Sequence, residues 1–280
     1  AILNKDDTSY KLLLKILKQE KYQSIEVITY GVNEKADIMS REIHNLDNGL
    51  EFILKINDKD YKIQTPLIGE YNAYNIMAAV SATAISLGLD IGCIMKGIAK
   101  LSGVPGRMEK IDMGQEFTTI VDFAHTPNAL KAALETSRNR TKGRVISVFG
   151  SAGLRDRDKR RLMAETSVRM ADISILTAED PRTESLDAIL AEMKDEAIKH
   201  GGIENSTVFC IPDRGKAIKK SVELAEKDDL VIICGKGHEQ SMCFGDEEYP
   251  WDDRIALRAA MASILKIAGP DMPYLPTQNR

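Results

Sequence analysis

The feature of this sequence that most restricts its fold is the alternation of strand-like and helix-like segments over residues 118–267. Short runs rich in Val, Ile and Phe are each followed by a longer run whose apolar residues recur at helical spacing. We expect strands at 118–123, 145–149, 173–177, 207–211 and 230–234, and helices at 129–138, 159–170, 186–199, 215–225 and 253–267. Such alternation predicts an α/β domain with a mostly parallel sheet and helices on both faces.

The residues ahead of this region have a different pattern. A helix is expected at 8–22, a strand at 25–30, a hairpin from the runs 51–56 and 61–64, and further helices at 72–89 and 91–101. A loop, Gly103-Val104-Pro105-Gly106, follows the last of them. We therefore place a domain boundary near Met108, with domains at residues 1–108 and 109–280.

Composition narrows the class of protein. With 280 residues and 43% hydrophobic residues, the chain is long enough for two cores. A net charge of -4 argues against binding nucleic acid or an anionic membrane through many phosphate contacts. The four cysteines form no CxxC pair, and no segment resembles a membrane span or a signal peptide, so we expect a cytoplasmic protein.

Four polar motifs follow strands of the predicted sheet. Ligands of open α/β sheets bind beyond the carboxyl ends of the strands, so these motifs are candidates for a site. They are Asp122-Phe123-Ala124-His125-Thr126-Pro127, Gly150 to Arg160, Glu179-Asp180-Pro181-Arg182-Thr183-Glu184 and Gly235-Lys236-Gly237-His238-Glu239. Arginine can grip a carboxylate or phosphate in a fork, and neighbouring acidic and basic groups suit a zwitterionic ligand.

Each motif alone also has a purely structural explanation. Asp122 could cap the next helix, with His125 merely at the surface, and Ser185 or Thr183 could be the N-cap after the third motif. The glycines and lysine of the last motif are not a P-loop, because the GxxxxGK[ST] spacing is missing. Three charged residues we interpret as a solvated helix start, namely Arg157, Asp158 and Arg161.

Two amides mark the first domain. Asn72 and Asn75 lie three residues apart at the start of a predicted helix. An amide can donate and accept a hydrogen bond at once, which matches the edge of a purine base. Capping of the helix by Asn72 explains the residue equally well.

Taken in order, six segments resemble the succession found in the Mur ligase family, the ATP-dependent amide-forming enzymes of cell-wall precursor synthesis. The segments are GEYNAYN, PGRME, VDFAHTPNAL, VFGSAGLRDRDKRRLM, TAEDPRTES and GKGHE, within residues 69–239. The opening Ala1-Ile2-Leu3-Asn4-Lys5-Asp6-Asp7 also resembles a strand and Asn-x-Asp-Asp segment of the family's central ATPase domain. The similarity is to the tripeptide synthetase type, which adds the third residue to UDP-N-acetylmuramoyl-dipeptide.

This resemblance implies a fold and a nucleotide site. Residues 1–108 are the remainder of a central ATP-binding domain, and residues 109–280 are a C-terminal Rossmann-like domain that binds an amino acid. The residues implied to face ATP are Asn72 and Asn75 at the adenine, Asp122 near the ribose, and Arg107 and the catalytic His125 near the phosphates.

The resemblance also implies an amino-acid site and a reaction. The implied pocket residues are Arg155, Asp180, Arg182, Gly235 and Glu239. The arginines can pair with a carboxylate, and the acids can hold an ammonium group. The terminal carboxylate of UDP-N-acetylmuramoyl-L-Ala-D-Glu is activated by ATP as an acyl phosphate, which the amine of an amino acid, often a diamino acid, attacks. Mg²⁺ neutralises the crowded phosphates.

The sequence departs from the family pattern in the segments that it lacks and at three positions. The family's P-loop, magnesium-binding residues, modified lysine and UDP-binding domain lie ahead of Ala1, so we expect a fragment that acts with the missing N-terminal portion of the same protein. Asp180 stands where the diaminopimelate type has Asn, Leu154 where it has an acid, and Phe123 where it has Tyr. An acid at Asp180 favours a cationic substrate group, whereas Arg182 marks the diaminopimelate type. Diaminopimelate, lysine and other amino acids therefore stay open.

Three other functions were compared with the sequence. Related ligases act on folate, on cyanophycin or on lipid-linked wall precursors. A non-catalytic module that senses a small zwitterion is an alternative from another class. A dinucleotide-dependent dehydrogenase is excluded, because no GxGxxG follows a strand.

We predict that the 280-residue chain alone neither hydrolyses ATP nor forms the amide bond. Without a P-loop it has no means of cradling the β- and γ-phosphates. Phosphate release in the presence of ATP, Mg²⁺, the dipeptide substrate and diaminopimelate should equal the rate without protein. Turnover above that background would refute the interpretation.

Overall fold

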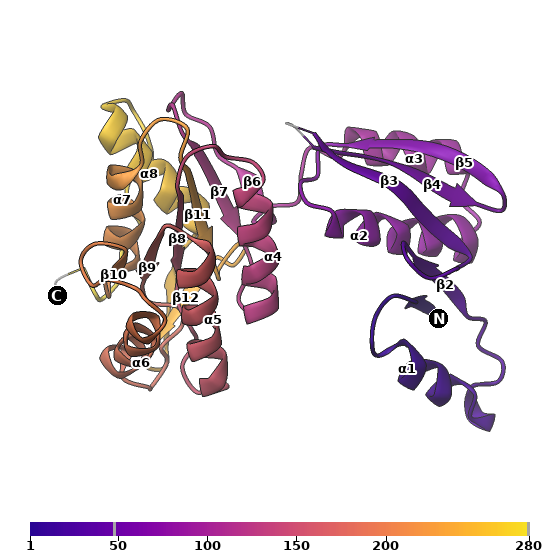
Figure 1. Cartoon of the computed structure of the whole chain (residues 1–280), viewed down its shortest axis with the longest axis horizontal. Helices are drawn as coiled ribbons and strands as arrows, with labels where there is room; N and C mark the ends of the chain where they lie inside the picture. Colours follow the sequence, from indigo (N-terminus) through magenta and orange to yellow (C-terminus); the bar gives the residue numbers. More distant parts are fainter. Residues whose placement is uncertain (47–48, 279–280) are drawn as a thin grey trace. The chain divides into compact units, whose positions relative to one another are not determined.

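The computed structural model describes residues 1–46 and 49–278 and divides the chain into two compact units (Figure 1). Unit 1 comprises Ala1–Gly103 and unit 2 comprises Val104–Arg280. The division falls a few residues before Met108, so Arg107 belongs to unit 2. No helix among the described residues combines the length and the apolar character needed to cross a membrane.

Unit 1 is built on a five-stranded sheet in the order β1-β2-β3-β4-β5. Its strands are β1 (Ile2–Asn4), β2 (Ile28–Gly31), β3 (Ile38–Leu46), β4 (Gly49–Ile56) and β5 (Lys59–Thr65). The first three are parallel, and β3, β4 and β5 form an antiparallel meander. The predicted hairpin is confirmed as β4 and β5. The sequence did not indicate β3, whose second half is mostly exposed and reads as polar.

The helical segments of unit 1 are α1 (Tyr10–Leu17), the 3₁₀ turn η1 (Glu20–Tyr22), α2 (Tyr71–Val80), the π-helical η2 (Ser81–Ser86) and α3 (Ile91–Lys100). The helix expected at 72–89 therefore changes its hydrogen-bonding pattern after Val80. Ser81 Oγ donates to the carbonyl of Met77 and Thr83 Oγ1 to that of Ala79, a competition with the backbone that favours such a change.

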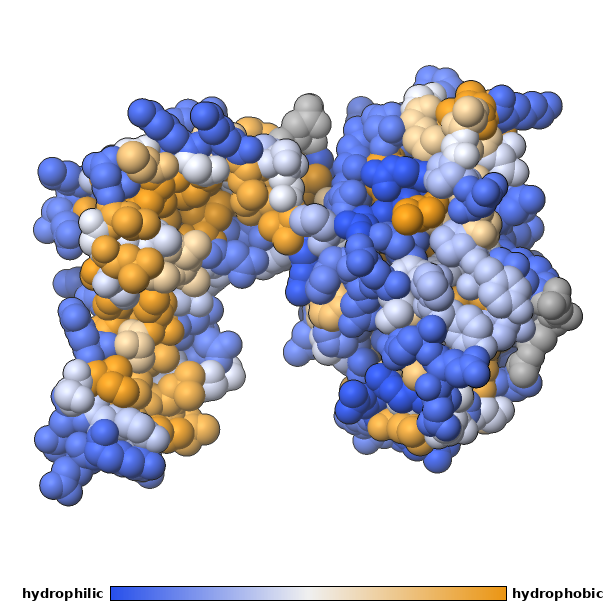
Figure 2. Space-filling model, turned by 180° about the vertical axis from the view of Figure 1, so that it is seen from behind, coloured by the Kyte–Doolittle hydropathy of each residue, from blue (hydrophilic) through white to orange (hydrophobic). Residues whose placement is uncertain are grey.

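The core of unit 1 lies between α2 and the sheet. Phe52 and Leu54 of β4 pack in one buried cluster with Met77 and Val80 of α2. In contrast, no residue of α1 is buried. Figure 2, in which unit 1 is on the left, shows a broad apolar area on this unit. Apolar surface left in water contributes none of the stabilisation that burial gives, so the unit depends on the α2 core.

Unit 2 contains the predicted parallel sheet, in the order β10-β9-β8-β11-β7-β6. Its strands are β6 (Glu109–Lys110), β7 (Thr118–Asp122), β8 (Val145–Phe149), β9 (Ile173–Leu176), β10 (Val208–Cys210) and β11 (Leu230–Cys234). All are parallel except β6, which runs antiparallel to β7. Strand β11 returns between β7 and β8, and this reversal of strand order is where ligands of such sheets bind.

Helices cover both faces of this sheet, as expected. They are α4 (Pro127–Arg138), α5 (Arg157–Met170), α6 (Leu186–Lys199), α7 (Arg214–Leu224) and α8 (Asp253–Leu265). Figure 1 shows α4, α5 and α6 on one face and α7 and α8 on the other.

The N-caps are Thr126 for α4 and Ser185 for α6, so capping by Asp122 or Thr183 is wrong. The hairpin of β12 (Ser241–Phe244) and β13 (Glu247–Pro250) was not expected.

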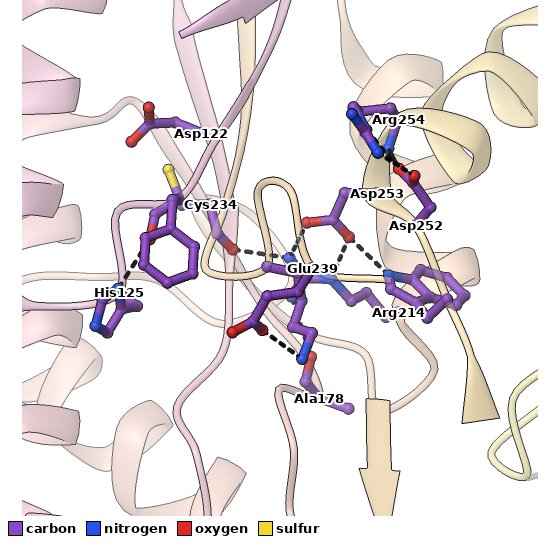
Figure 3. Close-up of polar contacts among 12 residues, drawn as sticks. Asp122, His125, Ala178, Arg214, Cys234, Glu239, Asp252, Asp253 and Arg254 are labelled. Atoms are coloured by element: carbon purple, nitrogen blue, oxygen red, sulfur yellow. Dashed lines mark hydrogen bonds and ion pairs between the residues drawn. The ribbon is translucent and has the colours of Figure 1, made fainter. Parts of the chain in front are cut away.

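A buried ion pair joins the two helices of one face to the strand ends. Arg214 and Asp253 side chains are 0% exposed, and Nε and Nη2 of the arginine donate to the two carboxylate oxygens at 2.7 Å each (Figure 3). The same guanidinium donates to the carbonyls of Ala178, at 3.0 Å, and Cys234, at 2.8 Å. Trp251 Nε1 also donates to Asp253 Oδ1 at 2.8 Å. The pair thereby ties α7 and α8 to the ends of β9 and β11.

We predict that Arg214→Met destabilises unit 2 by about 3–5 kcal/mol, because it leaves the Asp253 carboxylate buried without a counter-charge. Trp251, the single tryptophan of the chain, is buried in unit 2 and reports its unfolding by fluorescence in denaturant titrations. Lys219→Met, which removes an exposed pair with Glu223 on α7, is the matched control and should leave the midpoint nearly unchanged. Equal effects of the two variants would contradict the assignment.

Candidate functional site

The loops that leave the strands of unit 2 are tied together at one edge of the sheet. Gly235 N–H donates to the carbonyl of Asp122 at 3.2 Å, which joins the loops after β11 and β7. Gly153 N–H donates to the carbonyl of Asp180 at 2.9 Å, which joins the loops after β8 and β9. An ion pair between Lys236 and Asp180 joins the loops after β11 and β9. The loops that carry the four motifs singled out in the sequence are therefore connected to one another.

The two arginines predicted to bind a carboxylate come from neighbouring loops. Arg182 Nη1 donates to the carbonyl of Gly153 at 3.0 Å, two residues before Arg155. The backbone of Arg182 is anchored to the hairpin through the carbonyl of Cys243 and the N–H of Gly245. Arg155 is exposed, and no hydrogen bond or ion pair connects it to the described residues. Its guanidinium is thus free to meet an anionic ligand.

A buried lysine lies between the two acidic residues of the predicted pocket. The Lys236 side chain is 3% exposed, and Nζ lies 2.9 Å from both carboxylate oxygens of Asp180. Its distance to Glu239 Oε2 is 2.7 Å. Asp180 Oδ1 accepts a further hydrogen bond from Cys243 N–H at 2.9 Å. The sequence pointed to this lysine as a charged residue just after a strand, but it indicated no role for it.

Glu179 is a buried acid to which the sequence analysis gave no role. Burial raises its pKa to about 7, although the charges of Lys159, Arg214 and Lys236 oppose the shift. Its Oε2 has no hydrogen-bond partner among the described residues. Gly235 has φ +113° and a Cβ there would lie 3.0 Å from this oxygen, so the predicted pocket glycine is required by both backbone and space.

The carboxylate of Asp122 is held by backbone donors. Met108 N–H donates to Oδ2 and Ala124 N–H to Oδ1, both at 2.8 Å. Burial raises the pKa of this carboxyl from its ordinary value, and the two N–H groups and Arg107 oppose the shift. The position of Asp122 is therefore set within unit 2 itself.

Basic and imidazole groups surround the ring of Phe123. The Arg107 guanidinium carbon lies 4.5 Å from the ring centre, and the rings of His125 and His238 lie at 4.4 Å and 4.9 Å. His125 Nδ1 is 3.0 Å from the carbonyl of Phe123, so this nitrogen is the donor and Nε2 is left for a ligand. The predicted Arg107 and His125 are thus brought together, and His238 joins them. The N–H groups of the Arg107 guanidinium suit phosphate oxygens.

The amides of unit 1 contact each other at the start of α2. Asn72 Nδ2 donates to the carbonyl of Ile68 at 2.7 Å, and Asn75 Nδ2 donates to Asn72 Oδ1 at 3.0 Å. The residue at the N-cap position is Glu70, which makes no side-chain capping bond, so capping by Asn72 is wrong. Asn75 is exposed at the surface of unit 1.

A further ion pair supports the loop after β8. Arg160 is buried, and Nη1 donates to Glu184 Oε1 at 2.7 Å. Glu184 Oε2 also accepts from Leu154 N–H at 2.9 Å. The Arg160 guanidinium and this N–H lower the pKa of Glu184 to about 2. Arg157, Asp158 and Arg161 nearby are exposed, as expected for a solvated helix start.

Among the described residues, a possible metal-binding group lies on α5 and α6 rather than in these loops. It consists of Glu165, Glu196 and His200. Arg169 already contacts two of them, with Nε 2.9 Å from Glu165 Oε1 and Nη2 3.2 Å from His200 Nδ1. We therefore assign it no role.

We predict that Glu179 makes the stability of unit 2 depend on pH. Its pKa is about 7 when folded and 4.5 ordinarily, so the folded state keeps a proton that the unfolded state loses. Stability from this group is present below pH 4.5 and falls by about 3 kcal/mol up to pH 7. Glu179→Gln should flatten the Trp251-monitored stability between these pH values relative to wild type. An unchanged pH slope in the variant would show that the acid is already ionised.

Comparisons with known proteins agree with this arrangement. The Mur ligase middle domain matches residues 1–83, and the Mur ligase glutamate ligase domain matches residues 106–237. The UDP-N-acetylmuramoyl-L-alanyl-D-glutamate-2,6-diaminopimelate ligase of Geobacillus thermodenitrificans is 40% identical over 262 residues, covering 93% of this chain and 51% of that protein. The UDP-N-acetylmuramyl-tripeptide synthetase of Roseiflexus sp. is 37% identical over 264 residues, covering 94% and 51%.

Solved structures show the same fold. A structure of a UDP-N-acetylmuramoyl-L-alanyl-D-glutamate-2,6-diaminopimelate ligase has a TM-score of 0.57 and 33% identity, and the match covers 95% of this chain and 53% of that one. The Mycobacterium tuberculosis folylpolyglutamate synthase has a TM-score of 0.66 at 17% identity, which shows the fold alone. The chain spans about half the length of the curated relatives it matches. With both domain matches and these relatives in agreement, the chain belongs to the Mur ligase family and carries sequence of its middle and glutamate ligase domains.

Proposed function

We propose that this chain supplies the amino-acid-binding part and the adenine-facing part of an ATP-dependent ligase. The enzyme adds an amino acid, a diamino acid in our proposal, to UDP-N-acetylmuramoyl-L-Ala-D-Glu in peptidoglycan precursor synthesis. The observation that supports the proposal is that the loops carrying Arg155, Arg182 and Glu239 are joined at the sheet edge, through Arg182 and the Gly153 carbonyl and through the ion pair of Lys236 with Asp180. The similarity to diaminopimelate ligases supports it.

The amino-acid end of the proposed site is complementary to a zwitterion. Among the described residues, Arg155 has no hydrogen-bond or ion-pair partner and Arg182 donates one side-chain hydrogen bond, so both retain donors for a carboxylate. Glu239 is 40% exposed and presents a carboxylate to an ammonium group. Gly235 avoids a close contact with Glu179, whose Oε2 would lie 3.0 Å from a Cβ at this position. A substrate with a second carboxylate and a second ammonium group, such as diaminopimelate, uses both kinds of contact.

For the nucleotide, we propose contact residues in each unit, each described by itself. In unit 2, the Arg107 guanidinium supplies donors that suit phosphate, and His125 lies against the same Phe123 ring with Nδ1 bonded to the Phe123 carbonyl. Asp122 is held by backbone N–H groups for the ribose. In unit 1, Asn75 keeps a carbonyl oxygen for the adenine, while Asn72 orients it through their mutual hydrogen bond.

ATP is a substrate of the proposed reaction. The γ-phosphoryl group passes from ATP to the terminal carboxylate of the dipeptide, which releases ADP and gives an acyl phosphate. The amine of the bound amino acid then attacks the acyl carbon, and inorganic phosphate and a proton leave as the amide bond forms. Mg²⁺ bound with ATP neutralises the phosphates, and we assign no ligand for it to this chain. The residues of this chain orient the amine and provide positive charge at the phosphates.

We predict that the chain binds meso-diaminopimelate in calorimetric titrations and that Arg182→Ala weakens this binding about 10- to 100-fold, the usual range for loss of a hydrogen-bonded charge pair. Binding of L-lysine, which has one carboxylate fewer, should weaken less. Arg161→Ala is the matched control, because Arg161 is exposed on α5 and pairs with Asp158. Equal losses for both amino acids would contradict the role of Arg182, and no binding by the wild-type chain would count against the proposed function.

A further inference from the structure

Lys236 occupies the centre of the charged part of the site. Three carboxylate oxygens lie within 2.9 Å of its Nζ, two from Asp180 and one from Glu239. The ammonium group is removed from water, because the side chain is only 3% exposed. An ammonium has three N–H donors, so the three contacts leave none for a ligand. Lys236 therefore acts through its two partners rather than on a substrate.

The carboxylate of Asp180 is engaged by the protein. Both of its oxygens contact Lys236, and Oδ1 also accepts from Cys243 N–H. The backbone of Asp180 has φ +38°, a region that a non-glycine residue occupies only when its surroundings hold it there. These bonds hold the turn in that conformation. The idea that Asp180 itself meets the cationic group of the amino acid is therefore not favoured by its geometry.

Glu239 differs from Asp180 in what it leaves free. Oε2 lies 2.7 Å from Lys236 Nζ, and Oε1 accepts no hydrogen bond from the described residues. The side chain is 40% exposed, against 17% for Asp180. Figure 3 shows the Glu239 carboxylate held at one side by an ion-pair contact. Of the two acids on Lys236, Glu239 is the one that can accept a hydrogen bond from a ligand.

We propose that Lys236 is a positioning residue that fixes Glu239 as the acceptor for an ammonium group of the incoming amino acid and withdraws Asp180 from that role. The proposal rests on the proposed function and deepens it. A free glutamate side chain loses rotamer freedom when it binds a ligand, whereas one already held by a buried ammonium loses less. One lysine against two carboxylates also leaves a net negative charge, which favours a cation.

The experiment compares Asp180→Asn with the double variant Lys236→Met/Asp180→Asn in the full chain. Loss of Lys236 alone leaves a buried acid without its partner, but the double variant removes both charges of that pair and should regain most of the stability, as followed by Trp251 fluorescence. The double variant still lacks the contact that holds Glu239. We expect it to bind meso-diaminopimelate at least fivefold more weakly than Asp180→Asn does. Pimelate, which has no ammonium group, should show no such difference.

The outcomes separate the two proposals. If the double variant binds diaminopimelate as tightly as Asp180→Asn, the positioning role is overturned. If wild type binds no amino acid at all, the proposed function fails, and a crystal structure of the double variant then decides the positioning role. Glu239 spread over several rotamers supports that role, and Glu239 in its wild-type position overturns it.

Discussion

The ion pair between Arg214 and Asp253 is the constraint on which the geometry of unit 2 depends. A buried pair gains little over well-packed apolar residues in stability, because both ions must be desolvated. The pair contributes by fixing direction, because the guanidinium donates to the carbonyl of Ala178, two residues after β9, and to that of Cys234, the last residue of β11, as well as to the carboxylate of α8. Glu179 and Gly235 follow these carbonyls directly, so the pair sets where both site loops begin.

The loops that begin next to this ion pair contain energetically unfavourable features of the kind that functional sites often have. Asp180 and Arg182 both have positive φ, and Glu179 has a pKa of about 7 and a buried oxygen with no hydrogen-bond partner in the described part of the chain. Each feature is unfavourable in isolation. They persist because Lys236, Cys243 and the surrounding strands over-determine the loop conformation. The substitution of Asp for Asn at position 180 fits this scheme, since the acid completes the coordination of a buried ammonium.

The aromatic residue at position 123 has a comparable explanation. Phe123 stands where the family has tyrosine, yet its contacts with Arg107, His125 and His238 are made by the ring rather than by a substituent. The ring gathers the three basic side chains in one place, and the carbonyl of Phe123 orients His125. A hydroxyl is not needed for either effect.

Sequence alone determined the architecture of unit 2 and the places where chemistry gathers. Its parallel strands are buried on both faces and appear as continuous apolar runs, and the charged motifs directly after them predicted the edge of the site. Strands β3, β6, β12 and β13 were missed because they are partly exposed or very short, and their residues lack such a run. Only the tertiary structure decided which charges are available to a ligand. Lys236 and Asp180 are 56 residues apart in the chain, and Arg214 and Asp253 are 39 apart. Burial and pairing across such separations depend on how the loops pack, which no local pattern of residues contains.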